Sequence, residues 1–480
     1  MTRLVVGPFN RVEGDLEVTL ETAEGRVRAA YVNSPLYRGF EQILRGKAPL
    51  DSLVFAPRIC GICSVSQSSA AAAALADAMG LSMPPNGRLS ANLIHAAENV
   101  ADHLTHFYLF FMPDFARPCY AGHAWHDDAL RRFQAVRGSA AKDVLPARAG
   151  FFSLMGLLAG KWPHTLAIQP GGATRALESA EKIRVITMLR EFRRFLETTV
   201  FGDALESVAS LRSAQSLADW RGRGSRGDFG RFLDIADDIG LETLGWWPAR
   251  FLCYGAYVEE EAYLFPAGVW DGAVTPLNAL HIAEDLSRSL MGGPDHPLHP
   301  SEGVTQPLLE KAGGYSWCKA PRLAGQPMET GALARQQVAG HPLVRDLVAA
   351  SGANVRTRII ARLLEIALIV PRMERWAMQL RPGERYCAQG RLPETGSGVG
   401  LVEAARGSLG HWLRIEHGRI RNYQIIAPTT WNFSPRDAAG TPGPLEQALV
   451  GTPVTGDEDT PVGVQHVVRS FDPCMVCTVH

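Results

Sequence analysis

The sequence has few cysteines, almost no net charge and no long uninterrupted hydrophobic run. Eight cysteines in 480 residues are too few for a disulfide framework, which favours a reducing interior. The 48 Lys and Arg residues nearly balance the 49 Asp and Glu residues, leaving a net charge of −1. No basic field therefore indicates binding to nucleic acid or to an anionic membrane. We expect the partner to be another protein or a small neutral molecule.

Segments that would place the chain in or across a membrane are also missing. The longest apolar stretch, 359–370, is interrupted by Arg362 and Glu365 and is followed by Pro371, so it reads as a buried helix. The amino terminus enters strand-like sequence without a charged and then apolar leader. These features predict a cytoplasmic chain without direct membrane insertion.

Four of the cysteines form two Cys-x-x-Cys pairs near opposite ends of the chain, Cys60 with Cys63 and Cys474 with Cys477. One such pair is compatible with a redox dithiol, half of a zinc site, part of an iron–sulfur site or two unrelated buried thiols. Two pairs roughly four hundred residues apart disfavour a zinc finger or ribbon, whose ligands come from short local loops. A thioredoxin-like site would leave the second pair unexplained. We favour one soft-metal site that the fold closes, with zinc or a simple cluster as the alternative.

The pattern of apolar residues predicts a mainly helical fold with small β-hairpins or sheets. Alternation over 16–31 predicts one hairpin, and the segments that flank His417-Gly418 predict a second over 412–426. Between the hairpins, helical periodicity predicts helices over 64–80, 90–112, 174–201 and 354–380, the first two capped by Ser64 and Ser90. The segment 217–337 is rich in glycine, proline and tryptophan and is expected to form loops and short strands. Because the two ends must meet, residues 1–480 are expected to form a single domain.

The residues around the cysteine pairs make the interpretation more specific. The flanks read Arg58-Ile59-Cys60-Gly61-Ile62-Cys63 and Asp472-Pro473-Cys474-Met475-Val476-Cys477, with His480 three residues later. Five further motifs are Arg11-Val12-Glu13-Gly14, Arg38-Gly39-Phe40-Glu41, Asp102-His103 with His106-Phe107-Tyr108, Arg406-Gly407-Ser408-Leu409 and Pro428-Thr429-Thr430-Trp431-Asn432. In this order the motifs resemble those of the large, catalytic subunit of NiFe hydrogenases. The resemblance implies the large-subunit fold and the oxidation of dihydrogen.

The resemblance implies that the four cysteines hold a nickel–iron centre, Ni-Fe(CO)(CN)2. Cys60 and Cys474 match terminal ligands of nickel, whereas Cys63 and Cys477 match ligands that bridge nickel and iron. The position of Cys63 just before an alanine-rich helix agrees with this, because a helix N-terminus favours a thiolate. Heterolytic cleavage of dihydrogen needs an acidic metal and a nearby base, and thiolate ligands suit both requirements.

The resemblance also assigns a proton path. Cys474, as a terminal ligand, is expected to take the first proton from dihydrogen. Glu13 matches the glutamate that relays this proton. Without the resemblance, Glu13 would be interpreted as a surface ion-pair residue beside a hairpin.

Other matched residues surround the metals. Arg406 matches an arginine held over the bimetallic centre, and Asp102 and Asp472 match the carboxylates that orient it. Thr429 matches the hydroxyl residue that donates a hydrogen bond to cyanide. Such groups are needed because cyanide and carbon monoxide are anionic or dipolar ligands in a dry pocket.

A second metal site is implied near the carboxyl terminus. Glu41 and His480 match ligands of a magnesium-type ion, with the backbone carbonyl of Ile425 as a third ligand. Hard cations usually prefer oxygen, so the histidine ligand rests on the resemblance alone.

Departures from the family pattern favour its regulatory, hydrogen-sensing branch. Gln67 stands where the family has a histidine after the second cysteine, which is expected to alter hydrogen bonding near a bridging thiolate. Ile62 and Phe110 stand where many members have the smaller valine and leucine at the mouth of the gas channel, and the larger side chains are expected to slow oxygen entry. The sequence stops at His480, either as a trimmed mature form or as in the regulatory branch. We expect a slow, oxygen-tolerant enzyme whose output is a signal.

The remaining cysteines bear on which protein partners the chain needs. The other cysteines form no set able to hold iron–sulfur clusters, so electrons are expected to leave through an iron–sulfur small subunit, in a heterodimer or a dimer of heterodimers. A histidine kinase and maturation proteins are further expected partners. Two alternatives stay open, an energy-conserving uptake hydrogenase and, outside enzymes, a zinc-stabilised or metal-free scaffold similar to a complex I subunit. The four intact cysteines argue against the scaffold.

Overall fold

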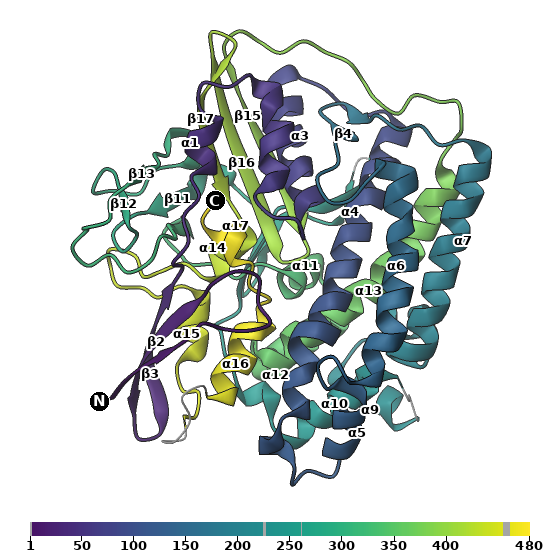
Figure 1. Ribbon diagram of the computed structural model, residues 1–480, viewed down its shortest axis with the longest axis vertical. Coiled ribbons are helices and arrows are strands. Elements are labelled where there is room, and N and C mark those ends of the chain that lie inside the picture. The colour runs from purple at the N-terminus through teal and green to yellow at the C-terminus, as the bar shows by residue number, and fades with distance from the viewer. Residues whose placement is uncertain (1, 224–226, 261, 455–460) are drawn as a thin grey trace.

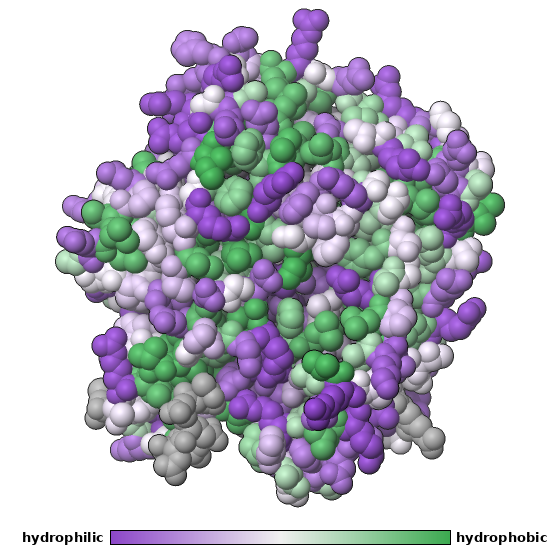
Figure 2. All heavy atoms as spheres, in the orientation of Figure 1, coloured by the Kyte–Doolittle hydropathy of each residue, from purple (hydrophilic) through white to green (hydrophobic). Residues whose placement is uncertain are grey.

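The computed structural model describes residues 2–223, 227–260, 262–454 and 461–480. It is mainly helical with small sheets, which confirms the predicted fold class. Figure 1 shows a bundle of long helices on one side and the sheets with shorter helices on the other. On the face drawn in Figure 2, hydrophilic and hydrophobic residues are interspersed. Among the described residues, no helix is long and apolar enough to cross a membrane.

Four long helices form the bundle, α4 (Pro85–Thr105), α6 (Ser139–Ala159), α7 (Ser179–Phe195) and α13 (Val355–Gln379). Both α13 and α6 pack against α4 and α7. Helix α13 is buried around most of its circumference, as expected of a central helix. Asn354 caps α13 by accepting a hydrogen bond from the Thr357 N–H at 3.0 Å. The helix predicted over 354–380 is therefore confirmed.

The alanine-rich helix α3 (Ser64–Met79) lies on β15 (Gly396–Ala404), the first strand of an antiparallel sheet with β16 (Gly407–Glu416) and β17 (Arg419–Ile426). Strands β16 and β17 confirm the second predicted hairpin. A Cβ atom at Gly398 would lie 1.9 Å from the Ala74 carbonyl oxygen, and one at Gly400 would lie 2.0 Å from the Ala70 carbonyl oxygen. The close contact between α3 and the sheet therefore requires glycine in β15.

The two ends of the chain pack against each other. The amino-terminal sheet contains β1 (Thr2–Val6), β2 (Glu17–Ala23) and β3 (Arg26–Asn33), which confirms the first predicted hairpin. The carboxyl-terminal segment carries α14 (Pro428–Asn432), α15 (Pro444–Leu449), α16 (Val462–Ser470) and α17 (Met475–Thr478). Helix α15 packs on β3, and α14 packs on α17. In Figure 1 the carboxyl terminus lies near the middle of the view, beside α14 and α17.

The remaining α-helices and strands of the described residues are shorter. The helices are α1 (Phe40–Leu44), α2 (Ser52–Phe55), α5 (His126–Phe133), α8 (Leu205–Ala209), α9 (Ala214–Gly222), α10 (Asp228–Asp238), α11 (Ala332–Ala339) and α12 (Pro342–Ser351). The strands are β4 (Ile168–Gln169), β5 (Gly172–Ala173), β6 (Arg250–Cys253), β7 (Ala256–Glu259), β8 (Ala262–Phe265), β9 (Gly268–Asp271), β10 (Val274–Thr275), β11 (Ile282–Asp285), β12 (Met291–Gly292), β13 (Gln306–Pro307) and β14 (Ala320–Leu323). The segment 217–337 thus contains the predicted short strands. It also contains α10 and most of α9 and α11, which the prediction missed, as it missed α5, α6, α8 and α12 outside this segment.

The predicted caps of α3 and α4 are wrong, and α7 begins at Ser179 rather than at 174. The N-cap residue of α3 is Cys63 rather than Ser64. The carboxylate of Glu98 in α4 instead accepts hydrogen bonds from the first turn of α3, from Val65 N at 2.8 Å and Ser66 N at 2.9 Å. Helix α4 begins at Pro85, well before Ser90, because proline at the first helical position needs no hydrogen-bond acceptor. The acceptor for the first backbone N–H groups of α3 is therefore Glu98 of α4, and not the side chain of Ser64.

Candidate metal centre

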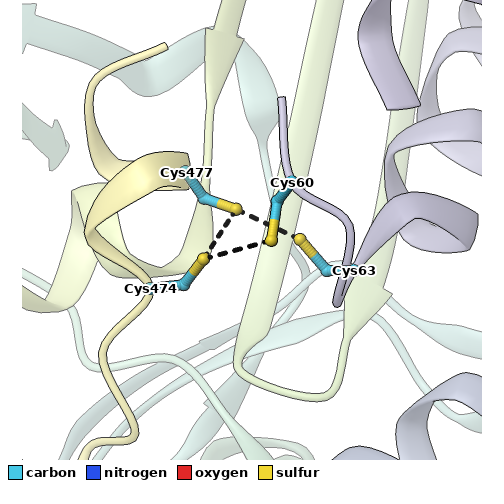
Figure 3. A group of neighbouring side chains, drawn as sticks. All are labelled: Cys60, Cys63, Cys474 and Cys477. Carbon is cyan, nitrogen blue, oxygen red and sulfur yellow. Dashed lines mark hydrogen bonds between the residues drawn. The ribbon is translucent and has the colours of Figure 1, made fainter. Parts of the chain in front are cut away.

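The two cysteine pairs meet inside the molecule, as Figure 3 shows. The sulfur of Cys474 lies 3.5 Å from that of Cys60 and 2.9 Å from that of Cys477, and the sulfurs of Cys63 and Cys477 lie 3.1 Å apart. All four sulfurs lie within 4.8 Å of one another, and all four residues are buried. Over the described ranges, no second cluster of cysteine, histidine and acidic side chains has such ligand spacing. Four buried sulfur donors fit a soft metal centre better than a hard cation.

Backbone contacts hold the carboxyl-terminal cysteine pair against residues 11–14. Glu13 and Cys474 form a parallel β-bridge, and the Met475 N–H donates to the Glu13 carbonyl oxygen at 2.7 Å. Gly14 has a φ of +81°, and a Cβ atom there would lie 3.1 Å from the Cβ atom of Met475. Glycine suits both the left-handed backbone and the close approach. The motif at 11–14 therefore holds the second cysteine pair in place.

Neighbouring groups shift the pKa values of the four thiols in different directions. Hydrogen bonds from the other thiols, Cys474 first, lower the pKa of Cys60 well below its ordinary value. The same kind of contact raises the pKa of Cys63, and burial raises the pKa of Cys474 and Cys477. One thiolate is thus favoured while its neighbours keep their protons. A bound soft cation would replace the remaining protons, which fits a metal centre at this position.

Arg406 is buried between two carboxylates. Its Nη1 lies 3.0 Å from Asp102 Oδ2, and its Nη2 lies 3.1 Å from Asp472 Oδ1. Its Nε donates to the backbone oxygen of Asp472 at 2.9 Å. Arg362 Nη1 lies 3.2 Å from the other oxygen of Asp472. The structure therefore brings together the arginine and both carboxylates that the motifs imply, and it adds a second arginine.

Burial and neighbouring charges shift the pKa values of Arg406, Asp102 and Asp472 differently. Burial alone would lower the pKa of Arg406, but Asp102 and Asp472 outweigh it, and the pKa lies well above its ordinary value. Burial raises the pKa of Asp102 to about 7. For Asp472, burial acts in the same direction, but Arg406 and His106 outweigh it and the pKa lies below its ordinary value. A permanent positive charge therefore stands next to the thiol cluster.

Glu13 and Thr429 flank the second cysteine pair. Glu13 is half-buried, and burial together with the nearby Cys60 raises its pKa above the ordinary value. The Thr429 hydroxyl oxygen, in α14, accepts a hydrogen bond from the Cys474 N–H at 3.1 Å. This geometry leaves the hydroxyl hydrogen of Thr429 to act as a donor.

The residues that suggested a sensing role lie in separate surroundings. Gln67 is buried in α3, and its Oε1 lies 2.8 Å from Nε2 of His411. Its Nε2 has no hydrogen-bond partner among the residues that the structure describes. Ile62 is half-buried against the main hydrophobic core, and the backbone oxygen of the half-buried Phe110 accepts a hydrogen bond from Arg11. A gas channel lined by Ile62 and Phe110 stays a prediction.

Two of the three predicted magnesium ligands, Glu41 and His480, come together, whereas the contact between Ile425 and Glu41 is made by the Ile425 N–H and not by its carbonyl oxygen. Glu41 Oε1 accepts a hydrogen bond from Ile425 N at 2.9 Å and lies 3.2 Å from His480 Nε2. Lys319 Nζ lies 3.2 Å from Glu41 Oε2 and 3.3 Å from Glu284 Oε2. A cavity of about 10 Å³ adjoins these residues, and Glu284 Oε1 has no hydrogen-bond partner within the described ranges. The Lys319 ammonium, which no motif revealed, already pairs with both buried carboxylates, so a magnesium-type ion at Glu41, Ile425 and His480 stays a prediction.

Three supporting residues were not predicted from the sequence. Arg362 binds Asp472, Glu98 caps α3, and Arg38 contacts the backbone of both cysteine segments. A weak signal existed for two of them, because Arg362 and Glu98 interrupt largely apolar helical sequence, and a buried charge needs a partner. Arg38 stood in a recognised motif that carried no assigned role for it.

Comparisons with known proteins agree with this site. Residues 38–144 and 143–480 match the family described as nickel-dependent hydrogenase. The chain belongs to this family. The predictions of a hydrogenase catalytic subunit and of the large-subunit fold are thereby confirmed, and the four cysteines fit the ligands expected for the nickel–iron centre of a hydrogenase.

Hydrogenases of several kinds are similar to this chain over its whole length. The large subunit of the periplasmic [NiFeSe] hydrogenase of Desulfomicrobium baculatum is 31% identical, and the match covers 100% of this chain and 95% of that relative. The uptake hydrogenase large subunit of Azotobacter chroococcum is 29% identical, with 100% and 95% covered. The structure of the reduced Ni-Fe-Se hydrogenase of D. vulgaris Hildenborough matches with a TM-score of 0.84 at 29% identity and covers 100% of both chains. These names give no support to the hydrogen-sensing branch.

Proposed function

We propose that this hydrogenase subunit cleaves dihydrogen heterolytically at a nickel–iron centre held by Cys60, Cys63, Cys474 and Cys477. The observation that carries the proposal is the cluster of four buried thiols, with every sulfur within 4.8 Å of the others, beside the buried Arg406 guanidinium. When bound, such a centre supplies a Lewis-acidic metal that polarises dihydrogen. By the resemblance of the motifs, Cys60 and Cys474 would hold nickel, and Cys63 and Cys477 would hold nickel together with iron.

Cys474 is the proposed first proton acceptor, and Glu13 is the proposed next carrier. Their β-bridge, together with the hydrogen bond from Met475 N to the Glu13 carbonyl, fixes the two backbones relative to each other. The raised pKa of Glu13, caused first by burial, makes its carboxylate a better proton acceptor than an ordinary glutamate. Because Glu13 is half-buried, it connects the buried thiols with the solvent side.

Arg406 and Thr429 are proposed to stabilise the ligands of iron. The Arg406 guanidinium offers a fixed positive charge to cyanide, and Asp102 and Asp472 hold it in orientation. The Thr429 hydroxyl, whose oxygen accepts from Cys474 N, is proposed to donate its hydrogen to cyanide. All four residues are buried, so water does not compete for these donors.

Electrons are proposed to leave through an iron–sulfur small subunit in a heterodimer. The relatives are named large subunits or large chains, and the described residues contain one metal-type cysteine cluster. A magnesium-type ion is proposed at Glu41, the Ile425 backbone and His480. The cytoplasmic location stays a prediction, because one relative is a periplasmic enzyme.

Hydrogen uptake for energy conservation is the physiological role that we propose first, because uptake hydrogenases are among the relatives. Sensing is the second candidate, and Gln67 favours it, since a buried amide paired with His411 occupies the position of the family histidine. Turnover with artificial electron acceptors separates the two. Fast turnover supports uptake, whereas slow, oxygen-resistant turnover together with binding of a histidine kinase supports sensing.

Isotope exchange tests the proposed cleavage. The chain, produced with a small subunit and maturation proteins, would be incubated with deuterium gas in ordinary water. Release of HD by the unaltered protein and its loss in Cys474→Ser are the expected results. A protein that contains nickel and iron but releases no HD would contradict the proposal, and stoichiometric zinc in place of nickel would favour the scaffold.

A further inference from the structure

One side chain contacts the backbone of both cysteine pairs. Arg38 follows β3 and precedes α1, and its Nη2 donates to the Ile59 carbonyl oxygen at 2.5 Å and also to the Val476 carbonyl oxygen. Ile59 directly precedes Cys60, and Val476 directly precedes Cys477. A single guanidinium therefore links the two ends of the chain at the position where they present their thiols.

Arg38 is an exposed residue whose backbone and guanidinium are both constrained by its neighbours in sequence. Gly39 has a φ of +75°, a left-handed conformation that glycine adopts readily, so the chain turns at once from Arg38 into α1. The guanidinium carbon of Arg38 lies 5.0 Å from the centre of the Phe40 ring, within the range of a cation–π contact. The Nη2 nitrogen carries two hydrogens, so it can donate one to each carbonyl oxygen.

Two other arginines near the thiol cluster contact the segment that precedes the second cysteine pair. Arg406 and Arg362 both contact Asp472, and Arg362 also donates to the Phe471 carbonyl oxygen at 3.1 Å. These contacts fix the segment that leads into the second cysteine pair. Arg38 in contrast ties this segment to the loop of the first pair.

We propose that Arg38 is a positioning residue that sets the separation of the two cysteine pairs and slows the loss of the metal bound between them. The inference rests on the proposed metal centre but not on hydrogenase activity, because it holds for whichever soft ion the thiols bind. Hydrogen bonds from a charged donor are stronger than neutral ones. Groups that orient metal ligands typically change metal affinity about 10-fold to 100-fold.

Three variants test the role of Arg38. Arg38→Met removes the guanidinium and keeps an apolar stem, Arg38→Lys keeps the charge, and Arg45→Met changes an exposed arginine just after α1 as the matched control. Each chain would be produced with the small subunit and maturation proteins, and nickel loss to a chelator would be followed by elemental analysis. We expect loss about 10-fold to 100-fold faster in Arg38→Met, an intermediate rate in Arg38→Lys and an unchanged rate in Arg45→Met.

A spectroscopic measurement separates positioning from general destabilisation. The carbon monoxide and cyanide infrared bands of Arg38→Lys are expected to shift from those of the unaltered protein. Unchanged nickel loss and unshifted bands in both Arg38 variants would overturn the inference. If Arg38→Met does not fold, Arg38→Lys decides by the same two measurements. An unaltered protein that holds zinc would refute the proposed function, whereas the rate of zinc loss would still test Arg38.

Discussion

Glu13 is half-buried, its backbone forms a β-bridge with Cys474, and its carboxyl group is close enough to Cys60 for the two to interact. The variant Glu13→Gln keeps the shape of the side chain and removes its ability to carry a proton. Dihydrogen oxidation is expected to fall about 100-fold to 10,000-fold, the range for loss of a general acid–base group. Nickel and iron content, measured on the same sample, should stay unchanged. Full turnover in Glu13→Gln would exclude Glu13 from the proton path.

Arg406 satisfies two buried carboxylates at the same time. Arg406→Lys keeps the charge but loses the planar fork, which leaves one carboxylate poorly paired. The free energy of unfolding is expected to fall by about 3 kcal/mol, and dihydrogen oxidation at least about 10-fold. Urea titration and an activity assay check the two effects. The control Arg414→Lys, at a side chain 58% exposed, should change stability by less than about 0.5 kcal/mol.

Single site residues could be predicted from the sequence where they stand in a motif, and not where their role depends on contacts with distant residues. Cys60, Glu13 and Arg406 stand in ordered motifs, so their positions near the centre could be predicted. Arg362 and Lys319 could not, because their roles depend on acidic partners such as Asp472 and Glu284 that only the fold brings near. A charge within apolar helical sequence, such as Arg362, indicates that a partner exists, but the sequence does not show which distant residue that partner is.

Helix α3 carries the first cysteine pair at its N-terminus, so its seat on β15 determines where the thiols lie. Gly400→Ala would place a Cβ atom 2.0 Å from the Ala70 carbonyl oxygen and force the helix away from the strand. A loss of about 3 kcal/mol in the free energy of unfolding is expected, together with reduced nickel content. Gly150→Ala, in an exposed part of α6 where the added Cβ meets nothing within 4 Å, is the control and should be neutral or slightly stabilising. A neutral Gly400→Ala would contradict the packing argument.

A buried charge network joins three helices. Glu365 of α13 binds Arg335 of α11 at 2.7 Å and 2.9 Å and lies 3.0 Å from His103 of α4. Burial alone would raise the pKa of Glu365, but Arg335 and His103 lower it to about 2 from an ordinary value of 4.5. The folded protein therefore binds this proton more weakly than the unfolded chain does. The resulting stabilisation is present above about pH 4.5 and is lost as the pH falls towards 2.

Glu365→Gln tests this network. The free energy of unfolding at neutral pH is expected to fall by about 3 kcal/mol, because Arg335 loses a charged partner. Urea titrations at several pH values should show the gap between the unaltered protein and the variant closing below about pH 4.5. A gap that stays constant down to the lowest pH at which the protein is folded would rule out the proposed linkage.

Elements with strong local signals were predicted well, and those shaped by their neighbours were not. The two hairpins alternate clearly, and Asn354 marks the start of α13, so each was found from sequence. The start of α3 was misplaced by one residue, because Glu98 of another helix supplies its cap. Helix α6 was missed, since Pro146 lies within its span and much of the helix is exposed. Tertiary contact decided these boundaries, and local propensity did not.

The whole molecule is organised around contacts between its ends. Cys60 and Cys474 are 414 positions apart, and the main hydrophobic cluster includes both Val6 and Cys477. We propose on this basis that residues 1–480 form a single domain that closes over the metal. Such long-range contacts form late in folding, because the entropy of closing a long loop opposes them. The metal and the docking of the terminal segment are therefore expected to stabilise each other.

An infrared spectrum tests the central claim most directly. The chain purified with its small subunit would be measured in the carbon monoxide and cyanide stretching region, first under argon and then under dihydrogen. The account predicts bands in this region under argon and a shift of those bands after dihydrogen is added. A protein produced with its maturation proteins that shows no such bands would contradict the claim that Cys60, Cys63, Cys474 and Cys477 hold a nickel–iron centre.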